Sequence, residues 1–250
     1  MLCRHQKVLD NAHIVLGSKS PQRKRILTQV LGLKYECIGS NFEEDIDKSS
    51  CESPADYCLK TSYGKIEDLN ETLQFNYDLL ICSDTIVVTN DGEIFEKPNN
   101  ENDAKRMLSA LNNNTCSVIS SCIISYRISN HIPQVEAFYD ITKVKFNEYT
   151  MNDIESYIAT GEPYTKSGGF GLQSLGASLI RGIDGDYYNV EGFPVGKFGM
   201  ILSMMIDKGA AGAAAGAAAA SGDSNMDLEI ARKWWNDEKI RQESEKSENR

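Results

Sequence analysis

Clustered histidines, paired cysteines and long apolar runs are the features that this sequence lacks. Its three histidines, His5, His13 and His131, lie far apart without the spacing of metal ligands, which argues against a zinc site or a histidine-based catalytic triad. The seven cysteines include no Cys-x-x-Cys pair and are odd in number, which indicates reduced thiols in a cytoplasmic protein. No apolar run approaches the roughly 20 residues that cross a bilayer, and the N-terminus lacks the order of a signal peptide. We therefore expect a soluble cytoplasmic protein with no membrane partner.

Length and composition predict one folded domain followed by a linker and a tail. A chain of 250 residues, 41% of them hydrophobic, can bury one substantial core, which we expect over residues 1–208. Residues 209–222 are an alanine- and glycine-rich low-complexity stretch, which predicts a linker. Residues 223–250 form a charged tail with two tryptophans, for which a short helix that docks a partner and a disordered segment are both open.

Apolar periodicity predicts alternating strands and helices, and therefore an α/β fold. Proline begins two of the expected helices, as it does at a first helical position. The sequence Asn90-Asp91-Gly92-Glu93 predicts a hairpin turn. The expected strands cover residues 13–17, 34–38, 78–88, 94–96, 117–127 and 135–146, and the expected helices cover residues 21–31, 54–69, 101–111, 151–159 and 194–206.

The connection between the first expected strand and helix has the composition of an anion site. It contains two serines and several cations in the order Gly17-Ser18-Lys19-Ser20-Pro21-Gln22-Arg23-Lys24-Arg25. Such a turn offers free backbone N–H groups, the positive end of the helix dipole and full charges, a combination that suits phosphate. Since the formal net charge of −10 argues against a nucleic-acid polymer as partner, a free nucleotide is the favoured ligand.

A carboxylate interrupts the apolar strand expected over residues 78–88. Asp84 lies where a central strand is buried, so it is either a hydrogen-bonded structural residue or a functional one, a metal ligand or general base. The acidic cluster of Glu43, Glu44, Asp45 and Asp47 is either a solvated surface or a source of a second carboxylate. Two carboxylates with substrate phosphates would complete a Mg²⁺ site.

Two lysines and a glycine-rich turn are further candidates. Lys65 and Lys97 are each either surface residues or part of a cationic cleft, and their spacing alone does not choose between these alternatives. Residues 166–173 form a glycine-rich turn that matches no standard phosphate-binding loop. It is either a flexible connection or a backbone that approaches a ligand, with Gln173 able to recognise a base edge.

Five segments in the same order and approximate spacing resemble the Maf family of nucleoside triphosphate pyrophosphatases over residues 13 to about 206. They are Ser18-Lys19-Ser20-Pro21-Gln22-Arg23, Ser83-Asp84-Thr85, Glu96-Lys97-Pro98, Gly161-Glu162-Pro163 with Lys166 to Gln173, and Asn189-Val190-Glu191-Gly192-Phe193-Pro194. The resemblance implies a fold similar to that of inosine triphosphate pyrophosphatases, with an elongated mixed sheet flanked by helices in two lobes around a central cleft. It also implies a homodimer that hydrolyses the bond between the α and β phosphates with Mg²⁺ or Mn²⁺.

The resemblance also implies a role for individual residues. Asp84 corresponds to the proton acceptor, and Glu44 with Asp84 would hold the metal. The positions that match phosphate contacts are Ser18, Arg23, Lys65 and Lys97, and those that match base recognition are Gln22, Thr85 and Gln173.

The residues expected to recognise the base favour pyrimidine nucleotides but differ from the family pattern at one position. Thr85 is similar to the branch acting on dTTP and UTP, whereas Gln22 stands where that branch usually has arginine. We therefore expect a dTTP/UTP pyrophosphatase that also accepts modified pyrimidine nucleotides. A 7-methyl-GTP-directed or purine-directed enzyme and a nucleotide-responsive regulatory protein are the alternatives.

Overall fold

The computed structural model describes residues 2–127 and 134–216 and has a mixed α/β fold. Its seven-stranded sheet has the order β2-β1-β3-β5-β6-β7, and β4 pairs with the end of β3. The strands are β1 (Ile14–Leu16), β2 (Glu36–Cys37), β3 (Leu79–Val88), β4 (Ile94–Phe95), β5 (Thr115–Tyr126), β6 (Gln134–Phe146) and β7 (Ile180–Asp184). The helices are α1 (Gln6–Asn11), α2 (Pro21–Arg25), α3 (Pro54–Thr72), α4 (Glu101–Leu111), α5 (Met151–Ala159), α6 (Tyr187–Glu191) and α7 (Val195–Gly216).

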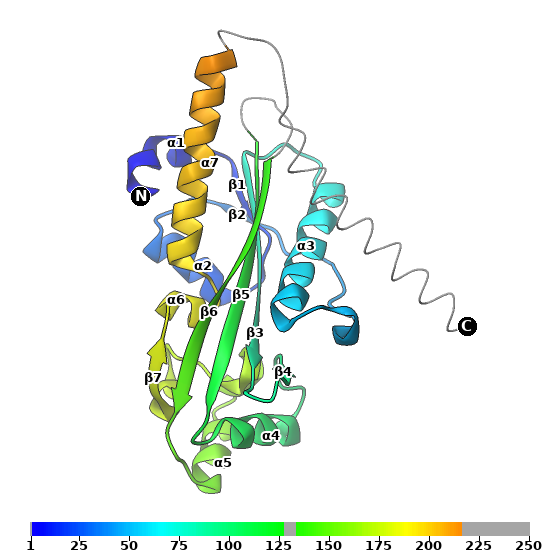
Figure 1. Cartoon of the computed structure of the whole chain (residues 1–250), viewed down its shortest axis with the longest axis vertical. Helices are drawn as coiled ribbons and strands as arrows, with labels where there is room; N and C mark the ends of the chain where they lie inside the picture. The colour runs from blue at the N-terminus through cyan, green and yellow to red at the C-terminus, as the bar shows by residue number, and fades with distance from the viewer. Residues whose placement is uncertain (1, 128–133, 217–250) are drawn as a thin grey trace, which may run out of the picture.

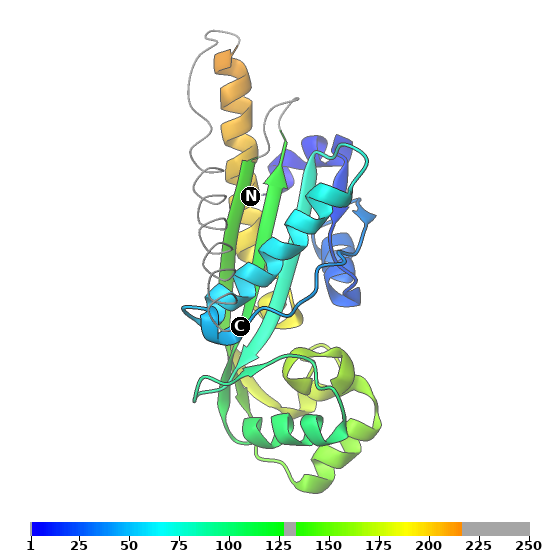
Figure 2. The same cartoon turned by 90° about the vertical axis from the view of Figure 1, so that its right-hand side faces the viewer.

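Helices cover both faces of an elongated sheet, as the sequence predicts. β1 is parallel to β2 and β3, whereas β5 is antiparallel to β3 and β6, and β6 is antiparallel to β7. Figures 1 and 2 show α3 on one face and α7 on the other. Alternation along β3 explains this arrangement, because Leu79 and Ile81 pack with α7 while Leu80 and Cys82 pack with α3.

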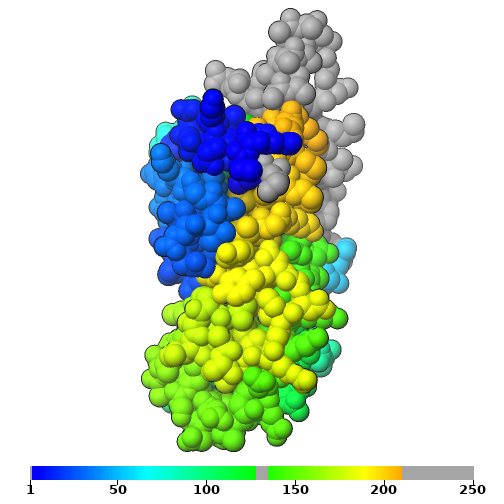
Figure 3. Space-filling model, turned by 90° about the vertical axis from the view of Figure 1, so that its left-hand side faces the viewer, coloured from blue at the N-terminus to red at the C-terminus, as the bar shows by residue number. Residues whose placement is uncertain are grey.

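Two lobes share the long central strands. One lobe contains α1, α2, α3 and α7, and the other has its own core beneath α4 and α5, built from Phe95, Leu108 and Phe170 among others (Figure 2). The N-terminal residues lie against α7 (Figure 3), where His5 Nε2 is 2.9 Å from Ser203 Oγ. None of the helices within residues 2–127 and 134–216 is long and apolar enough to cross a membrane.

The structure differs from the predicted elements mainly near the two ends of the domain. The sequence patterns missed α1, β7 and α6, which are short elements of five or six residues. The helix expected over 21–31 is an α-helix that becomes a π-helix at Ile26–Val30. Helix α7 continues to Gly216, into the stretch predicted as a linker from residue 209, because alanine is a strong helix former. The interpretations of residues 223–250 lie outside the described residues.

Candidate active site

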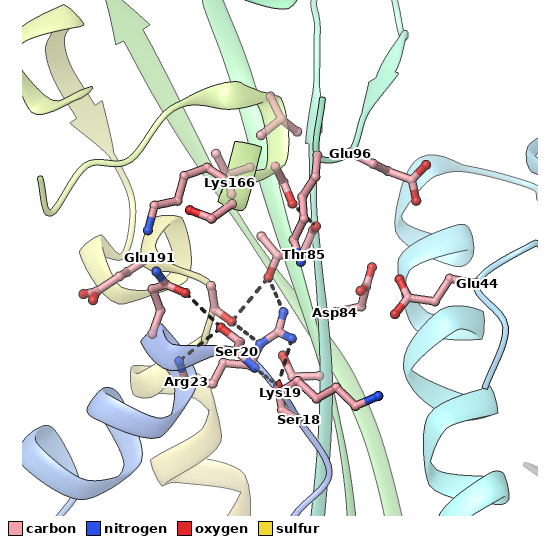
Figure 4. A pocket seen from close by; sticks show the side chains of 18 of the residues that line it. Ser18, Lys19, Ser20, Arg23, Glu44, Asp84, Thr85, Glu96, Lys166 and Glu191 are labelled. Carbon is pink, nitrogen blue, oxygen red and sulfur yellow. Dashed lines mark hydrogen bonds between the residues drawn. The ribbon is translucent and has the colours of Figure 1, made fainter. Parts of the chain in front are cut away.

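A cleft lies where the two lobes meet. Its cavity volume is about 940 Å³, and residues of both lobes line it, including Lys65 from one and Phe170 from the other. All of the site residues expected from the sequence line this cleft: Ser18, Gln22, Arg23, Glu44, Lys65, Asp84, Thr85, Lys97 and Gln173. Figure 4 shows Asp84 and Glu44 facing each other on one side, Lys166 and Glu191 on the opposite side, and Thr85 between them.

Lys65 joins the two candidate metal ligands. Its Nζ donates to Asp84 Oδ1 at 2.8 Å and lies 2.9 Å from Glu44 Oε1. Burial alone would raise the pKa of the Asp84 carboxyl, but the charges of Lys65 and Arg23 hold this pKa below its ordinary value of 3.8. Burial would also lower the pKa of Lys65, yet Asp84 raises it above its ordinary 10.5. Both groups are therefore charged at neutral pH.

Alternation along β3 directs Asp84 toward α3. Ser53 caps that helix by accepting from the Asp56 backbone N–H, and Pro54 occupies its first turn. The same face of α3 carries Cys58, whose Sγ donates to Asp84 Oδ2 at 3.8 Å, and Lys65. The strand and the helix thus hold the carboxylate from two sides.

The expected anion turn precedes α2. Ser20 caps this helix by accepting from the Arg23 backbone N–H at 3.4 Å, and its own N–H donates to Ser18 Oγ at 3.2 Å. Gly17 allows the turn to approach the sheet, because a Cβ there would lie 2.5 Å from Cys82 Sγ. The buried Ser18 and the α2 N-terminus consequently face the cleft.

Arg23 is held by three partners in the protein. Its Nε donates to the Gly192 carbonyl at 2.9 Å, its Nη2 to Thr85 Oγ1 at 2.8 Å, and its Nη1 contacts Ser18 Oγ at 3.5 Å. Gly192 has a φ of 115°, a conformation that favours glycine and that fixes the direction of this carbonyl. The guanidinium is therefore oriented before any ligand binds.

The hydroxyl of Thr85 is fully used within the protein. It accepts from Arg23, lies 2.9 Å from Ser120 Oγ and lies 3.3 Å from the Gly192 carbonyl. Ser120 donates to the Asn189 carbonyl at 2.8 Å, so Thr85 is the donor toward Ser120 or Gly192. Of these three partners, Arg23 lies closest to the Thr85 hydroxyl, at 2.8 Å.

The two glutamines expected to recognise a base differ in how firmly they are held. Gln22 Oε1 accepts from Ser20 Oγ at 3.1 Å, which leaves its amide N–H₂ available. Gln173 is half-buried and lines the same cleft.

The glycine-rich turn is hydrogen-bonded to β3 and to the residue after β4, so it is a held segment of the cleft and not a flexible connection. Ser167 Oγ donates to the Thr85 carbonyl at 2.8 Å, and the Gly168 N–H donates to the Glu96 carbonyl at 2.9 Å. Gly168 has a φ of 70°, and a Cβ there would lie 2.8 Å from Val87. The turn is therefore part of the cleft wall.

Three lysines of the cleft have no side-chain hydrogen bond or ion pair with any residue in the described part of the chain. They are Lys19 and Lys97, which are exposed, and Lys166, which is half-buried. Burial lowers the pKa of Lys166; the charges of Glu162 and Glu191 act in the opposite direction, and the positive charge of Lys97 lowers the pKa further. Like charges without an ion-pair partner in one cleft indicate a site for an anion. The set of candidates expected from the sequence includes Lys97 but not Lys166, although Lys166 begins a segment that resembles the family.

Glu96 and Glu191 were also absent from the expected set. Glu96 accepts from Tyr57 OH at 2.8 Å and from Lys48 Nζ at 2.6 Å, so it links the end of β4 to α3 and to the loop before that helix. Glu191 is buried and pairs with Arg25. Both residues occur in segments that carry the family resemblance, which was the available signal.

The donor atoms at Asp84 and Glu44 suit a divalent cation that also binds a substrate. Two carboxylates converge on one point, where the ammonium of Lys65 now lies. Within the described residues, no three His, Cys, Asp or Glu side chains gather to hold a metal by themselves. Mg²⁺ commonly takes one or two carboxylates and completes its shell with phosphates and water, so the residues present fit this ion.

The chain belongs to the family described as Maf-like protein, whose model matches residues 13–205. It is 38% identical over 186 residues to a dTTP/UTP pyrophosphatase of Clostridium perfringens, covering 74% of this chain and 92% of that protein. A dTTP/UTP pyrophosphatase of Pyrococcus furiosus is 38% identical, covering 73% of this chain and 90% of that protein. A human protein named probable bifunctional dTTP/UTP pyrophosphatase/methyltransferase is also 38% identical, but the match spans 79% of this chain and only 33% of that protein.

Among solved structures, a dITP/XTP pyrophosphatase of Mycobacterium abscessus is similar with a TM-score of 0.35 and 11% identity, over 54% of this chain and 74% of that chain.

Proposed function

We propose that this protein is a nucleoside triphosphate pyrophosphatase that converts dTTP, UTP and modified pyrimidine nucleotides to the monophosphate and pyrophosphate. The observation that carries the proposal is the buried Asp84, which accepts from Lys65 in the same cleft as the oriented Arg23 at the anion turn. Family membership and the names of the relatives from Clostridium and Pyrococcus support the same activity.

In the proposed reaction, Asp84 accepts a proton from a water molecule as the water oxygen attacks the α phosphorus. The new bond joins this oxygen to the α phosphorus, and the bond between that phosphorus and the α–β bridging oxygen breaks. The electron pair leaves with pyrophosphate. Arg23 and Ser18 donate to the phosphate oxygens in the transition state, and Lys97 and Lys166 neutralise the charge that accumulates on the leaving group.

Glu44 and Asp84 would hold Mg²⁺ or Mn²⁺ together with the substrate phosphates. A bound divalent ion would supply a positive charge that polarises the phosphoryl oxygens. Before that ion binds, Lys65 offsets part of the negative charge of the two carboxylates. EDTA should therefore abolish turnover without unfolding the protein.

We propose that Gln22 and Gln173 recognise the base, whereas Thr85, expected from the sequence to do the same, has its hydroxyl occupied by Arg23, Ser120 and the Gly192 carbonyl. The relatives' names and Thr85 support dTTP and UTP, whereas Gln22 favours the alternative of a 7-methyl-GTP-directed or purine-directed enzyme. We propose a cytoplasmic homodimer acting on free nucleotides; the resemblance supports the dimer, and the net charge of −10 supports free nucleotides over polymers.

The test is pyrophosphate release with Mg²⁺ from dTTP, UTP, CTP, 5-methyl-UTP, GTP, ITP and 7-methyl-GTP, with the Asp84→Asn protein as blank. We expect release from the thymine and uracil nucleotides and a loss of about 10²-fold or more in the variant. Selective release from 7-methyl-GTP would assign the other branch. No release from any nucleotide would leave the regulatory protein as the better account.

A further inference from the structure

An ion pair between Arg25, whose side chain is 39% exposed, and the buried Glu191 joins α2 to the end of α6. The side chain of Glu191 is 0% exposed, and its carboxylate accepts from the guanidinium of Arg25, with Nε 3.0 Å from Oε1 and Nη2 contacting both carboxylate oxygens. A carboxylate without solvent needs such a partner, since an unpaired buried charge is strongly destabilising. The geometry is that of two parallel donors on one carboxylate, which fixes orientation as well as distance.

Two separate contacts join α2 to the end of α6. Arg23 and Arg25 are two residues apart on α2, and Glu191 and Gly192 are consecutive at the end of α6. Arg25 holds the Glu191 side chain, while Arg23 Nε donates to the Gly192 carbonyl at 2.9 Å. The ion pair and the hydrogen bond from Arg23 to the Gly192 carbonyl thus join the same two segments.

The α6 segment is itself anchored to the sheet. The buried Asn189 donates through Nδ2 to the Val118 carbonyl and to Thr142 Oγ1, both at 3.1 Å. The Asn189 carbonyl accepts from Ser120, which also contacts Thr85. A continuous set of hydrogen bonds thus runs from β5 and β6 through α6 to the guanidinium of Arg23.

We propose that Arg25 and Glu191 are positioning residues whose ion pair fixes the Gly192 carbonyl and thereby orients Arg23 toward the substrate phosphates. This inference rests on the proposed function, because its readout is nucleotide hydrolysis. Neither residue touches the substrate in this account, and both act through Arg23.

The principal variant is Glu191→Gln, which keeps the shape of the side chain and removes its charge. We expect kcat/KM for UTP to fall about tenfold or more, since a displacement of about 1 Å in a positioned group can cost as much as 10²-fold. Its control is Glu155→Gln, which removes the carboxylate of an exposed ion pair with Lys105 in the other lobe and should leave kcat/KM unchanged. If Glu191→Gln fails to fold, the double variant Arg25→Met/Glu191→Met removes both charges together, which buried pairs tolerate better.

A double-mutant cycle separates positioning from general damage. In the Arg23→Lys background, the planar donor that Gly192 orients is gone, so Glu191→Gln should cause less than about a twofold further loss. An equal fold-loss in both backgrounds, or an unchanged kcat/KM for Glu191→Gln alone, would overturn the inference. If the unmodified protein releases no pyrophosphate from any nucleotide, the proposed function fails instead, so the two failures are distinguishable.

Discussion

Lys65 Nζ lies 2.8 Å from Asp84 Oδ1, and this contact makes the buried carboxylate a charged group at neutral pH. Burial by itself would raise the pKa of Asp84, whereas Lys65 and Arg23 lower it below its ordinary value of 3.8. Since the proposed base is the deprotonated form, kcat/KM should stay constant as the pH falls toward this value. It should decrease only as the pH falls through the lowered pKa, within the range where the protein stays folded.

Replacing Lys65 by methionine should shift the decrease of kcat/KM at low pH, the acid limb of the pH profile, to higher pH. The burial that raises the pKa of Asp84 remains in Lys65→Met, while the largest charge that lowers it is lost. A pH profile of kcat/KM measures the shift. The matched control is Lys48→Met, because Lys48 lines the same cleft but pairs with Glu96. An acid limb that is unmoved in Lys65→Met would contradict the assignment of Asp84 as the base.

Thr85→Val should weaken catalysis through Arg23. Valine keeps the shape of threonine but cannot accept the hydrogen bond from Arg23 Nη2, and a lost bond to a charged group costs about 1.5–3 kcal/mol. We therefore expect kcat/KM to fall by about tenfold or more for UTP and dTTP alike, whereas Thr85→Ser keeps the hydroxyl and retains activity. A loss confined to one base would instead show that Thr85 recognises the base directly.

Lys97→Met and Lys166→Met should weaken substrate binding without lowering the melting temperature. Neither side chain has a hydrogen bond or ion pair within residues 2–127 and 134–216, so no such contact in that part of the chain is lost with the charge. We expect KM for UTP and the inhibition constant for pyrophosphate to rise about tenfold, the effect of one charged contact of about 1.4 kcal/mol. Lys105→Met, which removes an exposed lysine paired with Glu101 and Glu155, is the control. Unchanged pyrophosphate inhibition in both variants would rule out the anion site.

Much of the fold and most of the site could be predicted from the sequence because the signals were local. The apolar run of β3 located Asp84, and the composition of the β1–α2 turn located Ser18 and Arg23. The structure brings both into one cleft, together with Lys65 from α3.

The contacts that orient these residues could not be predicted, because they join segments far apart in the chain. Arg23 and Gly192 are separated by 169 positions, and Arg25 and Glu191 by 166. The short α1, α6 and β7 carry too few residues to show a period, and β7 lies within a glycine-rich segment. Helix α7 passed its predicted end because alanines favour the helix despite the interspersed glycines.

Ser83→Ala should leave the protein as stable as before or more so. Ser83 Oγ is buried and has no hydrogen-bond partner in the described part of the chain. An unpaired buried polar group lowers the free energy of unfolding by about 1–3 kcal/mol, and Ser83→Ala removes this group. The control is Ser120→Ala on the neighbouring strand, which removes an equally buried hydroxyl that donates to the Asn189 carbonyl and should destabilise the protein. Chemical denaturation compares the free energies of unfolding, and a marked loss in Ser83→Ala would be contrary to this expectation.

The most direct test of the central claim is hydrolysis of UTP in ¹⁸O-labelled water, followed by mass spectrometry of both products. If water activated by Asp84 attacks the α phosphorus, the label appears in UMP, pyrophosphate carries none, and the Asp84→Asn protein incorporates label at least about 10²-fold more slowly. Label in pyrophosphate or orthophosphate, or undiminished labelling of UMP by the variant, would contradict the account.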